Sequence, residues 1–145
     1  MTKISNLVHY EDIPKYKKGW GYEKWIVNTE KYCGKQLVLG KGKKCSIHYH
    51  KLKTETFFVI EGSLMLELYS KPFEVIESDL EASIKAAGDI KVQRITMRTY
   101  DSLTIEPYTP HRFIGLSENP TVFLEFSTQH FEDDSYRIHP GDSQK

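Results

Sequence analysis

Apolar residues in this chain recur mostly at every second position, in short runs separated by Gly, Pro, Asn and Asp. This is the period of a β-strand, and the runs are rich in the β-branched and aromatic residues that strands favour. The pattern therefore predicts an all-β barrel or sandwich. Strands are expected at residues 23–27, 35–39, 44–48, 55–61, 63–69, 92–99, 102–105, 111–114 and 121–126.

Two local signals lie between these strands. Gly62 separates two alternating runs and can adopt the positive φ of a tight turn, so residues 56–60 and 64–68 are predicted to pair as a β-hairpin. A short helical insertion is predicted at residues 82–87. Ser78 to Glu81 has a capping-box pattern before it, Gly88 follows it, and Leu80, Ile84 and Ala87 would share one face. An irregular excursion is the alternative for this segment.

Length and charge limit the class of protein. The 145 residues predict a single domain over 1–145, with a barrel core at about 19–131, an N-terminal arm at 1–18 and a polar tail at 132–145. Twenty Lys and Arg residues balance twenty Asp and Glu residues, and no basic stripe is interleaved with aromatics. The broad positive field of a nucleic-acid binder is therefore missing, and we expect no nucleic-acid partner.

The ends and the cysteines suggest a location. Met1–Asn6 is polar and lacks the apolar stretch of a signal peptide, and no apolar run approaches the roughly 20 residues that span a bilayer. We therefore expect a cytoplasmic protein without membrane association. Cys33 and Cys45 lack the spacing and density of a metal or disulfide framework, so both are expected to remain thiols with a structural role.

The most informative stretch runs from Gly42 to Gly62 and contains His48, His50 and Glu55. Two histidines at a spacing of two project from the same side of a strand, and the four residues after His50 can turn the chain so that Glu55 begins a neighbouring strand. Imidazole plus carboxylate suits Zn, Mn, Fe, Ni or Co as a divalent ion, and is too rich in nitrogen for Ca or Mg. We expect one divalent transition metal per chain. A solvated or hydrogen-bonded histidine pair is the competing interpretation.

The same stretch matches the pattern G-x5-HxH-x4-E-x6-G at every fixed position, and it thereby resembles the first motif of the cupin family. The resemblance implies a double-stranded β-helix, or jelly-roll barrel, around a metal. The family's second motif, G-x5-P-x-G-x2-H-x3-N, implies His111 as the fourth ligand, although only His111 matches it here. Tyr100, Glu106, Tyr108 and Gly115 stand where that motif has Gly, Pro, Gly and Asn.

Other histidines compete for the site. His9, His130 and His139 lie outside both motifs in polar surroundings, and we expect them to be solvated or structural. His130 is the exception to watch, because it follows the last predicted strand and could reach the mouth of a barrel.

Four ligands leave positions open on a metal that prefers five or six, which suggests catalysis. The segments Gly19–Trp25 and Tyr32–Leu37 look like the cupin module of type II mannose-6-phosphate isomerases, with a likeness from about residue 19 to 131. The ending Phe126–Arg137 is similar to the tails of stand-alone cupins of sugar pathways. These resemblances imply an isomerase or epimerase of a sugar or sugar phosphate that works through an enediolate. An Fe(II) dioxygenase and a non-catalytic sugar-binding cupin are the alternatives.

Enediolate chemistry needs a base near the carbon-bound proton. The candidates are Glu61 and Glu106, with Glu67 and Glu125 as further carboxylates and Lys35 or Tyr22 as an assisting group.

Substrate contacts are expected from Tyr22, Arg98 and Arg112, and a phosphate would be contacted by Lys35 and the two arginines, because guanidinium groups match phosphate oxygens. A homodimer is expected, since small barrels expose strand edges and related cupins commonly dimerise.

Overall fold

The computed structural model describes residues 6–145. Of the polar N-terminal segment Met1–Asn6, residues 1–5 lie outside the described part of the chain. Strands dominate this part of the chain. They are β1 (Lys15–Lys18), β2 (Gly21–Asn28), β3 (Cys33–Leu39), β4 (Ile47–Tyr49), β5 (Glu55–Glu61), β6 (Leu64–Tyr69), β7 (Val92–Met97), β8 (Ser102–Ile105), β9 (His111–Gly115), β10 (Thr121–Ser127) and β11 (Tyr136–His139). The helical elements are η1 (Tyr10–Asp12), α1 (Leu80–Ala87) and η2 (Asp142–Gln144).

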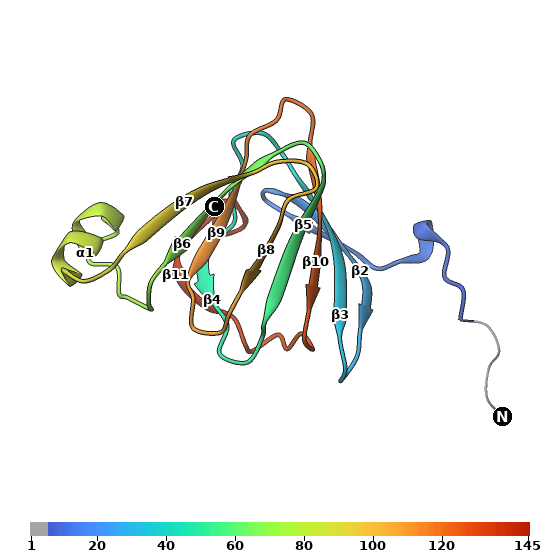
Figure 1. Cartoon of the computed structure of the whole chain (residues 1–145), viewed down its shortest axis with the longest axis horizontal. Helices are drawn as coiled ribbons and strands as arrows, with labels where there is room; N and C mark the ends of the chain where they lie inside the picture. The colour runs from blue at the N-terminus through green and yellow to red at the C-terminus, as the bar shows by residue number, and fades with distance from the viewer. Residues whose placement is uncertain (1–5) are drawn as a thin grey trace.

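The strands form two antiparallel sheets that enclose one core (Figure 1). One sheet has the order β1-β2-β3-β10-β5-β8, and the other has the order β11-β4-β9-β6-β7. Strand β10 lies between β3 and β5, so Phe123 stands opposite both Leu37 and Val59. This architecture confirms the predicted all-β jelly-roll.

Aromatic side chains from both sheets fill the core. Phe57, Phe113 and Phe123 meet edge to face, with ring centroids 5.1 to 6.1 Å apart. Such pairs contribute about 0.5–1.5 kcal/mol each beyond the burial of their apolar area. Phe57 and Val59 are at most 1% exposed, as the alternation in β5 predicts.

The predicted hairpin around Gly62 is wrong. Strand β5 pairs with β10 and β8 in one sheet, whereas β6 pairs with β9 and β7 in the other. Gly62, at φ +82°, therefore carries the chain from one sheet across to the next. An added Cβ would lie 3.0 Å from the hydroxyls of Ser117 and Thr121, so close packing as well as φ favours glycine here. Alternation alone cannot tell such a corner from a hairpin.

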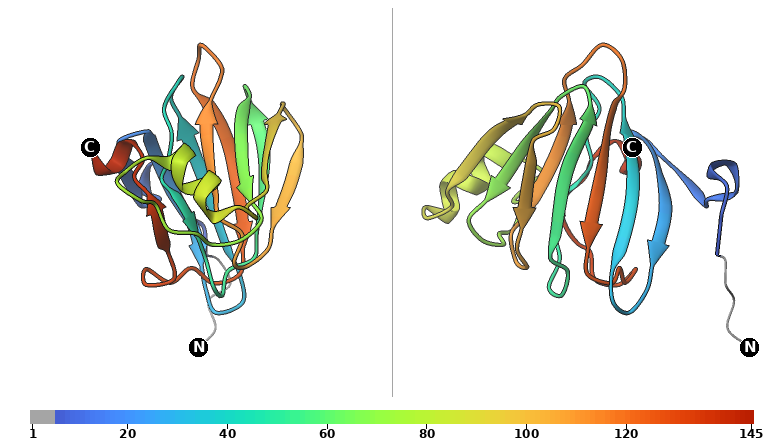
Figure 2. Two further views of the ribbon diagram at one scale, coloured as in Figure 1. Left: turned by 90° about the vertical axis from the view of Figure 1, so that its left-hand side faces the viewer. Right: turned by 45° about the vertical axis from the view of Figure 1, so that its right-hand side comes forward.

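The predicted helix is present, outside the barrel and beside the end of β6 and β7 (Figure 2). It begins at Leu80, earlier than the predicted residue 82, and Asp79 rather than Ser78 caps it by accepting a hydrogen bond from the Ala82 N–H. Its buried residue is Ser83, which donates to the Asp79 carbonyl and accepts from the Ile76 N–H, each at 2.6 Å. The predicted apolar face is only partly covered, and Ala87 on it is exposed.

Both predicted extensions of the barrel contain strands that the sequence pattern did not predict. In the arm, β1 pairs with β2, while the chain before it leads away from the barrel (Figure 1). In the tail, β11 pairs with β4 and places Arg137 opposite His48. A Cβ on Gly141 would lie within 2.5 Å of the backbone of Cys45 and Ser46, so the end of the tail packs closely against the barrel. Only tertiary pairing explains these strands, since both are short and polar.

None of the helices between residues 6 and 145 has the length and apolar character to cross a membrane. Cys33 and Cys45 are buried free thiols, as predicted.

Candidate metal centre

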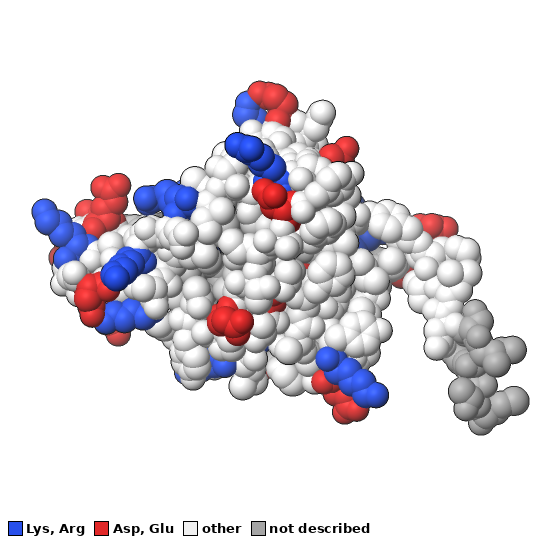
Figure 3. Space-filling view, viewed as in Figure 1, with Lys and Arg blue, Asp and Glu red and all other residues white. Residues whose placement is uncertain are grey.

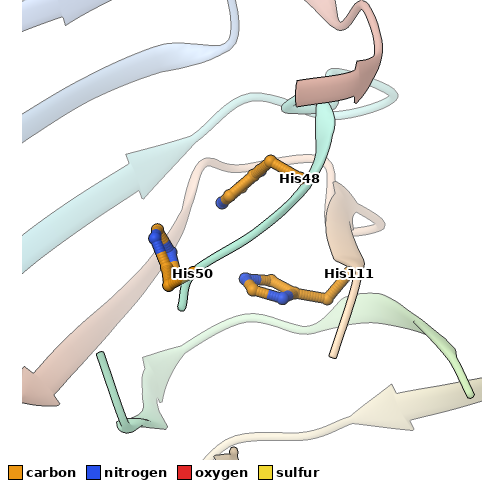
Figure 4. A group of neighbouring side chains, drawn as sticks. All are labelled: His48, His50 and His111. Atoms are coloured by element: carbon orange, nitrogen blue, oxygen red, sulfur yellow. The ribbon is translucent and has the colours of Figure 1, made fainter. Parts of the chain in front are cut away.

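Three histidines converge inside the barrel from the ends of short strands (Figure 4). His48 lies in β4, His50 directly follows it, and His111 is the first residue of β9. His48 and His111 are directly opposed in the antiparallel pair of β4 and β9, which places their side chains on the same face. Glu55, the first residue of β5, completes the group from the other sheet.

The donor atoms of this group lie close together. One ring nitrogen from each of the three histidines lies within 4.8 Å of those of the other two. The Glu55 Oε1 atom is 2.7 Å from His111 Nε2 and 3.7 Å from His50 Nε2. Two ligand atoms at right angles around an ion, each about 2.1 Å from it, are roughly 3 Å apart. The spacing of Glu55 and His111 is therefore that of two ligands to one ion.

Backbone carbonyls orient all three rings in the same way. Each Nδ1 lies 2.7 to 2.9 Å from a carbonyl oxygen, and a carbonyl only accepts, so each Nδ1 carries the proton. The pairs are His48 with Ser46, His50 with Asp134, and His111 with Thr109. In the neutral ring each Nε2 is then left with a free lone pair, which is the tautomer of a metal ligand whose outer partner is a carbonyl.

Two buried atoms of the group lack a hydrogen-bond partner. They are Glu55 Oε1 and His111 Nε2, which lie 2.7 Å apart without the alignment of a hydrogen bond. Glu55 is 2% exposed and His111 is 1% exposed, so water does not satisfy these atoms. Buried polar atoms without partners are costly, and a cation between them removes that cost. A donor set of three nitrogens and one oxygen fits a divalent transition metal.

The electrostatics of His48, His50 and Glu55 agree with this fit, whereas burial lowers the pKa of His111 but the charge of the adjacent Glu55 outweighs it and raises that pKa overall. Burial, reinforced by the other two imidazoles, lowers the pKa of His48 well below its ordinary value. Burial also lowers the pKa of His50, although Glu55 opposes the shift. Burial alone would raise the pKa of Glu55, but the neighbouring histidines and Lys53 outweigh it and the pKa falls. His48 and His50 are thus neutral and Glu55 ionised, as metal ligands must be.

A cavity of about 480 Å³ opens in front of this group. Its wall carries a second set of buried polar groups, on the six-stranded sheet and on the chain segments next to it. Lys53 Nζ lies 3.2 Å from Glu125 Oε2 and 2.8 Å from His130 Nδ1, and Lys35 Nζ lies 3.8 Å from Glu23 Oε1. Trp25 lines the cavity beside them, with the Lys35 ammonium 4.3 Å from its ring centroid. The volume is in the range of small-molecule sites.

Burial shifts the acid-base properties of this wall. Burial and the charge of Glu55 raise the pKa of Glu125, against the opposing effect of Lys53 and Lys35. Burial and the same two lysines lower the pKa of His130 to about 3, so its ring is neutral and accepts a hydrogen bond from Lys53. A buried carboxylate with a raised pKa beside a cation is a common arrangement for a general base.

The cavity does not include most of the predicted catalytic and substrate residues. Glu61 has the same alternation as Glu55 but is exposed, because β5 ends there beyond the core. Glu106 and Arg98 are exposed outside the strands. Lys35 lines the cavity.

Two other predicted substrate residues have partners elsewhere. Arg112 donates to the carboxylate of Glu67 at 3.1 and 3.3 Å, on the face of β9 opposite to His111, so both are already paired. Tyr22 precedes Glu23 on β2 and therefore points to the other face, where the ammonium of Lys15 lies 4.1 Å from its ring centroid.

Four cavity residues were missed or treated as doubtful by sequence reasoning. Lys53 lies two positions before Glu55, and Glu23 and Trp25 alternate on one face of β2, so the period of two could have indicated them. His130 does line the cavity, which agrees with the expectation that it could reach the mouth of the barrel.

Comparison with known proteins agrees with the fold and identifies a family. The chain is 29% identical over 108 residues to the D-lyxose ketol-isomerase of Cohnella laeviribosi, in a match that covers 70% of this chain and 58% of the relative. The chain therefore spans a little over half of that relative's length.

Solved structures share the barrel. An oxalate decarboxylase of Lactobacillus farciminis, in a formate complex, superposes with a TM-score of 0.69 and 18% identity, over 95% of this chain and 38% of the other. The capsular polysaccharide assembling protein CapF of Staphylococcus aureus gives a TM-score of 0.69 and 14% identity, over 88% of this chain and 32% of the other. At these identities the likeness establishes the cupin fold alone.

The family model of D-lyxose isomerase matches residues 19–139, which include the histidine group, Glu55 and nearly the whole barrel. The finer resemblance to mannose-6-phosphate isomerase modules stays a prediction. The cupin fold is confirmed, and the chain belongs to the D-lyxose isomerase family.

Proposed function

We propose that this chain is a metal-dependent aldose-ketose isomerase that acts on a free monosaccharide, with D-lyxose as the first substrate to test. The observation that carries the proposal is the buried pair of Glu125 and Lys53 in the cavity that His48, His50 and Glu55 also line. Family membership and the curated D-lyxose ketol-isomerase support the same reaction. One divalent ion per chain would be held by His48, His50, Glu55 and His111.

The reaction moves one proton from C2 of the aldose to C1 of the ketose, while a hydroxyl proton passes from O2 to O1. A divalent ion would supply Lewis acidity toward these two adjacent oxygens. We assign the C2 proton to the Glu125 carboxylate, which takes it as the C2–H bond breaks and returns it as the C1–H bond forms. Lys53 favours the ionised form of Glu125, because its charge opposes the rise in the pKa of that carboxyl. Its ammonium has three donors, of which Glu125 and His130 take two, so one is left for a substrate oxygen.

The cavity favours a neutral sugar over a sugar phosphate. Its lysines already face carboxylates, Lys35 with Glu23 and Lys53 with Glu125. Arg112, which we expected to contact phosphate, is held by Glu67 on the outer side of its sheet. Within residues 6–145, Arg137 is the cavity cation that is left without a carboxylate partner, and the other polar groups suit hydroxyl hydrogen bonds.

We also propose a homodimer formed through one face of the six-stranded sheet. The outer apolar face consists of Phe58, Ile60, Tyr100, Leu124 and Phe126, of which Tyr100 is 72% and Phe126 is 51% exposed. Charged side chains lie mainly around the margin of this face in the space-filling view (Figure 3). Contiguous exposed apolar patches of this kind are typical of interfaces, and a second copy offers a matching surface.

The test combines metal content with turnover. Protein purified without added metal is analysed by elemental mass spectrometry, then assayed anaerobically with D-lyxose and other aldoses in D2O, with ketose detected by NMR. We expect about one divalent ion per chain and ketose formation without oxygen, both lost in His48→Ala. Oxygen consumption with iron-dependent oxidation of the sugar would replace the isomerase with a dioxygenase. Metal and sugar binding without any ketose would indicate a binding protein.

A further inference from the structure

We propose that Asp134 is a positioning residue that sets the geometry of the loop between His50 and Glu55, and with it the retention of the metal. The inference rests on the proposed metal site. Asp134 lies in the segment that sequence reasoning treated as a polar tail, more than eighty positions from His50, yet its side chain is 3% exposed.

The carboxylate of Asp134 binds the backbone of the loop. Its Oδ1 accepts from the N–H groups of Lys51 and Leu52 at 2.9 and 3.1 Å. Its Oδ2 accepts from those of Lys53 and Leu52 at 3.1 and 3.3 Å. Three successive backbone N–H groups thus converge on one carboxylate, which is the anion-binding nest of a tight turn. Hydrogen bonds to a charged acceptor are the stronger kind, so this contact holds the loop firmly.

The backbone of Asp134 holds the ligand itself. Its carbonyl accepts from His50 Nδ1 at 2.7 Å, which fixes both the tautomer and the orientation of that ring. One residue therefore grips the loop through its side chain and His50 through its main chain. If the hydrogen bonds between the Asp134 side chain and the loop are lost, the Asp134 carbonyl also loses its position relative to His50.

The consequences extend to the rest of the site, because the loop of residues 51–54 connects His50 to Glu55. The loop also carries Lys53, whose ammonium contacts Glu125 and His130 in the cavity. Asp134 is itself held from the other side, since β11 follows it and pairs with β4, placing Tyr136 opposite Tyr49. The tail therefore holds β4, the loop of residues 51–54 and the start of β5 together.

Asp133 provides a matched control. It has the same chemistry and is adjacent in the chain, but it is exposed, whereas Asp134 is buried. The variants to compare are Asp134→Asn, which keeps the size and one acceptor oxygen, Asp134→Ala, and Asp133→Asn. In Asp134→Asn the amide NH2 faces a loop N–H, so part of the nest is lost.

The experiment is a titration of the metal-free proteins with Co(II), followed by the visible absorption of the bound ion, together with hydrogen exchange at the 51–53 amides. We expect a Kd raised about 10- to 100-fold in Asp134→Ala and less in Asp134→Asn, the range usual for outer partners of ligands. The absorption bands should shift and the three amides should exchange faster, whereas Asp133→Asn should match the wild type.

The outcomes separate this inference from the metal site itself. Failure of the wild type to bind Co(II) more tightly than His48→Ala would refute the proposed site. Normal wild-type binding with an unchanged Kd and spectrum in Asp134→Asn would refute the positioning role, even if the metal-free variant unfolds more easily. Should Asp134→Ala not fold, Asp134→Asn alone decides the question.

Discussion

Replacing Glu125 by Gln separates the chemical role of this carboxylate from its place in the fold. Gln keeps the size of the side chain and an acceptor for Lys53, whose Nζ lies 3.2 Å from Glu125 Oε2, but it cannot take a proton from C2. A positioned general base contributes about 10²- to 10⁴-fold to a rate. We therefore expect kcat for ketose formation to fall by that factor, equivalent to roughly 3–5 kcal/mol in activation free energy.

The fold should be affected much less. Losing a charge-assisted hydrogen bond costs about 1–3 kcal/mol of unfolding free energy, and the Gln acceptor recovers part of it. The four proposed metal ligands are untouched, so the metal content should stay at the wild-type level. The assays are ketose formation at saturating sugar, urea unfolding followed by circular dichroism, and elemental analysis.

Glu67→Gln is the matched control for this substitution. Glu67 is also a buried carboxylate held by a cation, 3.1 Å from Arg112, but it lies outside the cavity. We expect it to lose stability and to keep its turnover. Our assignment of the base is refuted if Glu125→Gln keeps more than about a tenth of the wild-type kcat, or if both variants lose activity in proportion to their stability.

Three further predictions follow from the same contacts. EDTA should lower the Tm of the wild type and leave that of His48→Ala unchanged. The reason is that a ligand present at about 100 times its Kd stabilises the folded state by roughly 2.7 kcal/mol. Equal Tm shifts in the two proteins would contradict metal binding at this site. Burial tends to raise the pKa of Glu67, but its hydrogen bonds from Tyr69 and Arg112 lower it overall, so its contribution to stability is present at neutral pH and is lost as pH falls through the lowered pKa. Urea unfolding should therefore show a stability gap between wild type and Glu67→Gln that is largest near pH 7 and shrinks in acid, and a constant gap would exclude ionisation as its cause. Phe126→Glu should convert the proposed dimer to monomers in sedimentation velocity with the metal content unchanged, and a wild type that sediments as a monomer would remove the basis for that interface.

The sequence by itself determined most of the strands and the core. Alternation of apolar residues is a local consequence of strand geometry, so β5 (Glu55–Glu61) and β8 (Ser102–Ile105) have the predicted bounds. The spacing of His48 and His50 likewise placed two imidazoles on one side of a strand. These features depend only on near neighbours in the chain.

Only the tertiary structure decided which distant residues meet. His111 stands opposite His48 because β9 pairs with β4, and no local pattern encodes that register. Gly62 turns between sheets rather than within a hairpin, and Glu61 falls beyond the core although its alternation matches that of Glu55. Asp134 reaches the loop after His50 because β11 pairs with β4. Local periodicity specifies the face of the strand on which a side chain lies, whereas pairing between strands far apart in sequence specifies the partners of that side chain. The site depends on this long-range pairing.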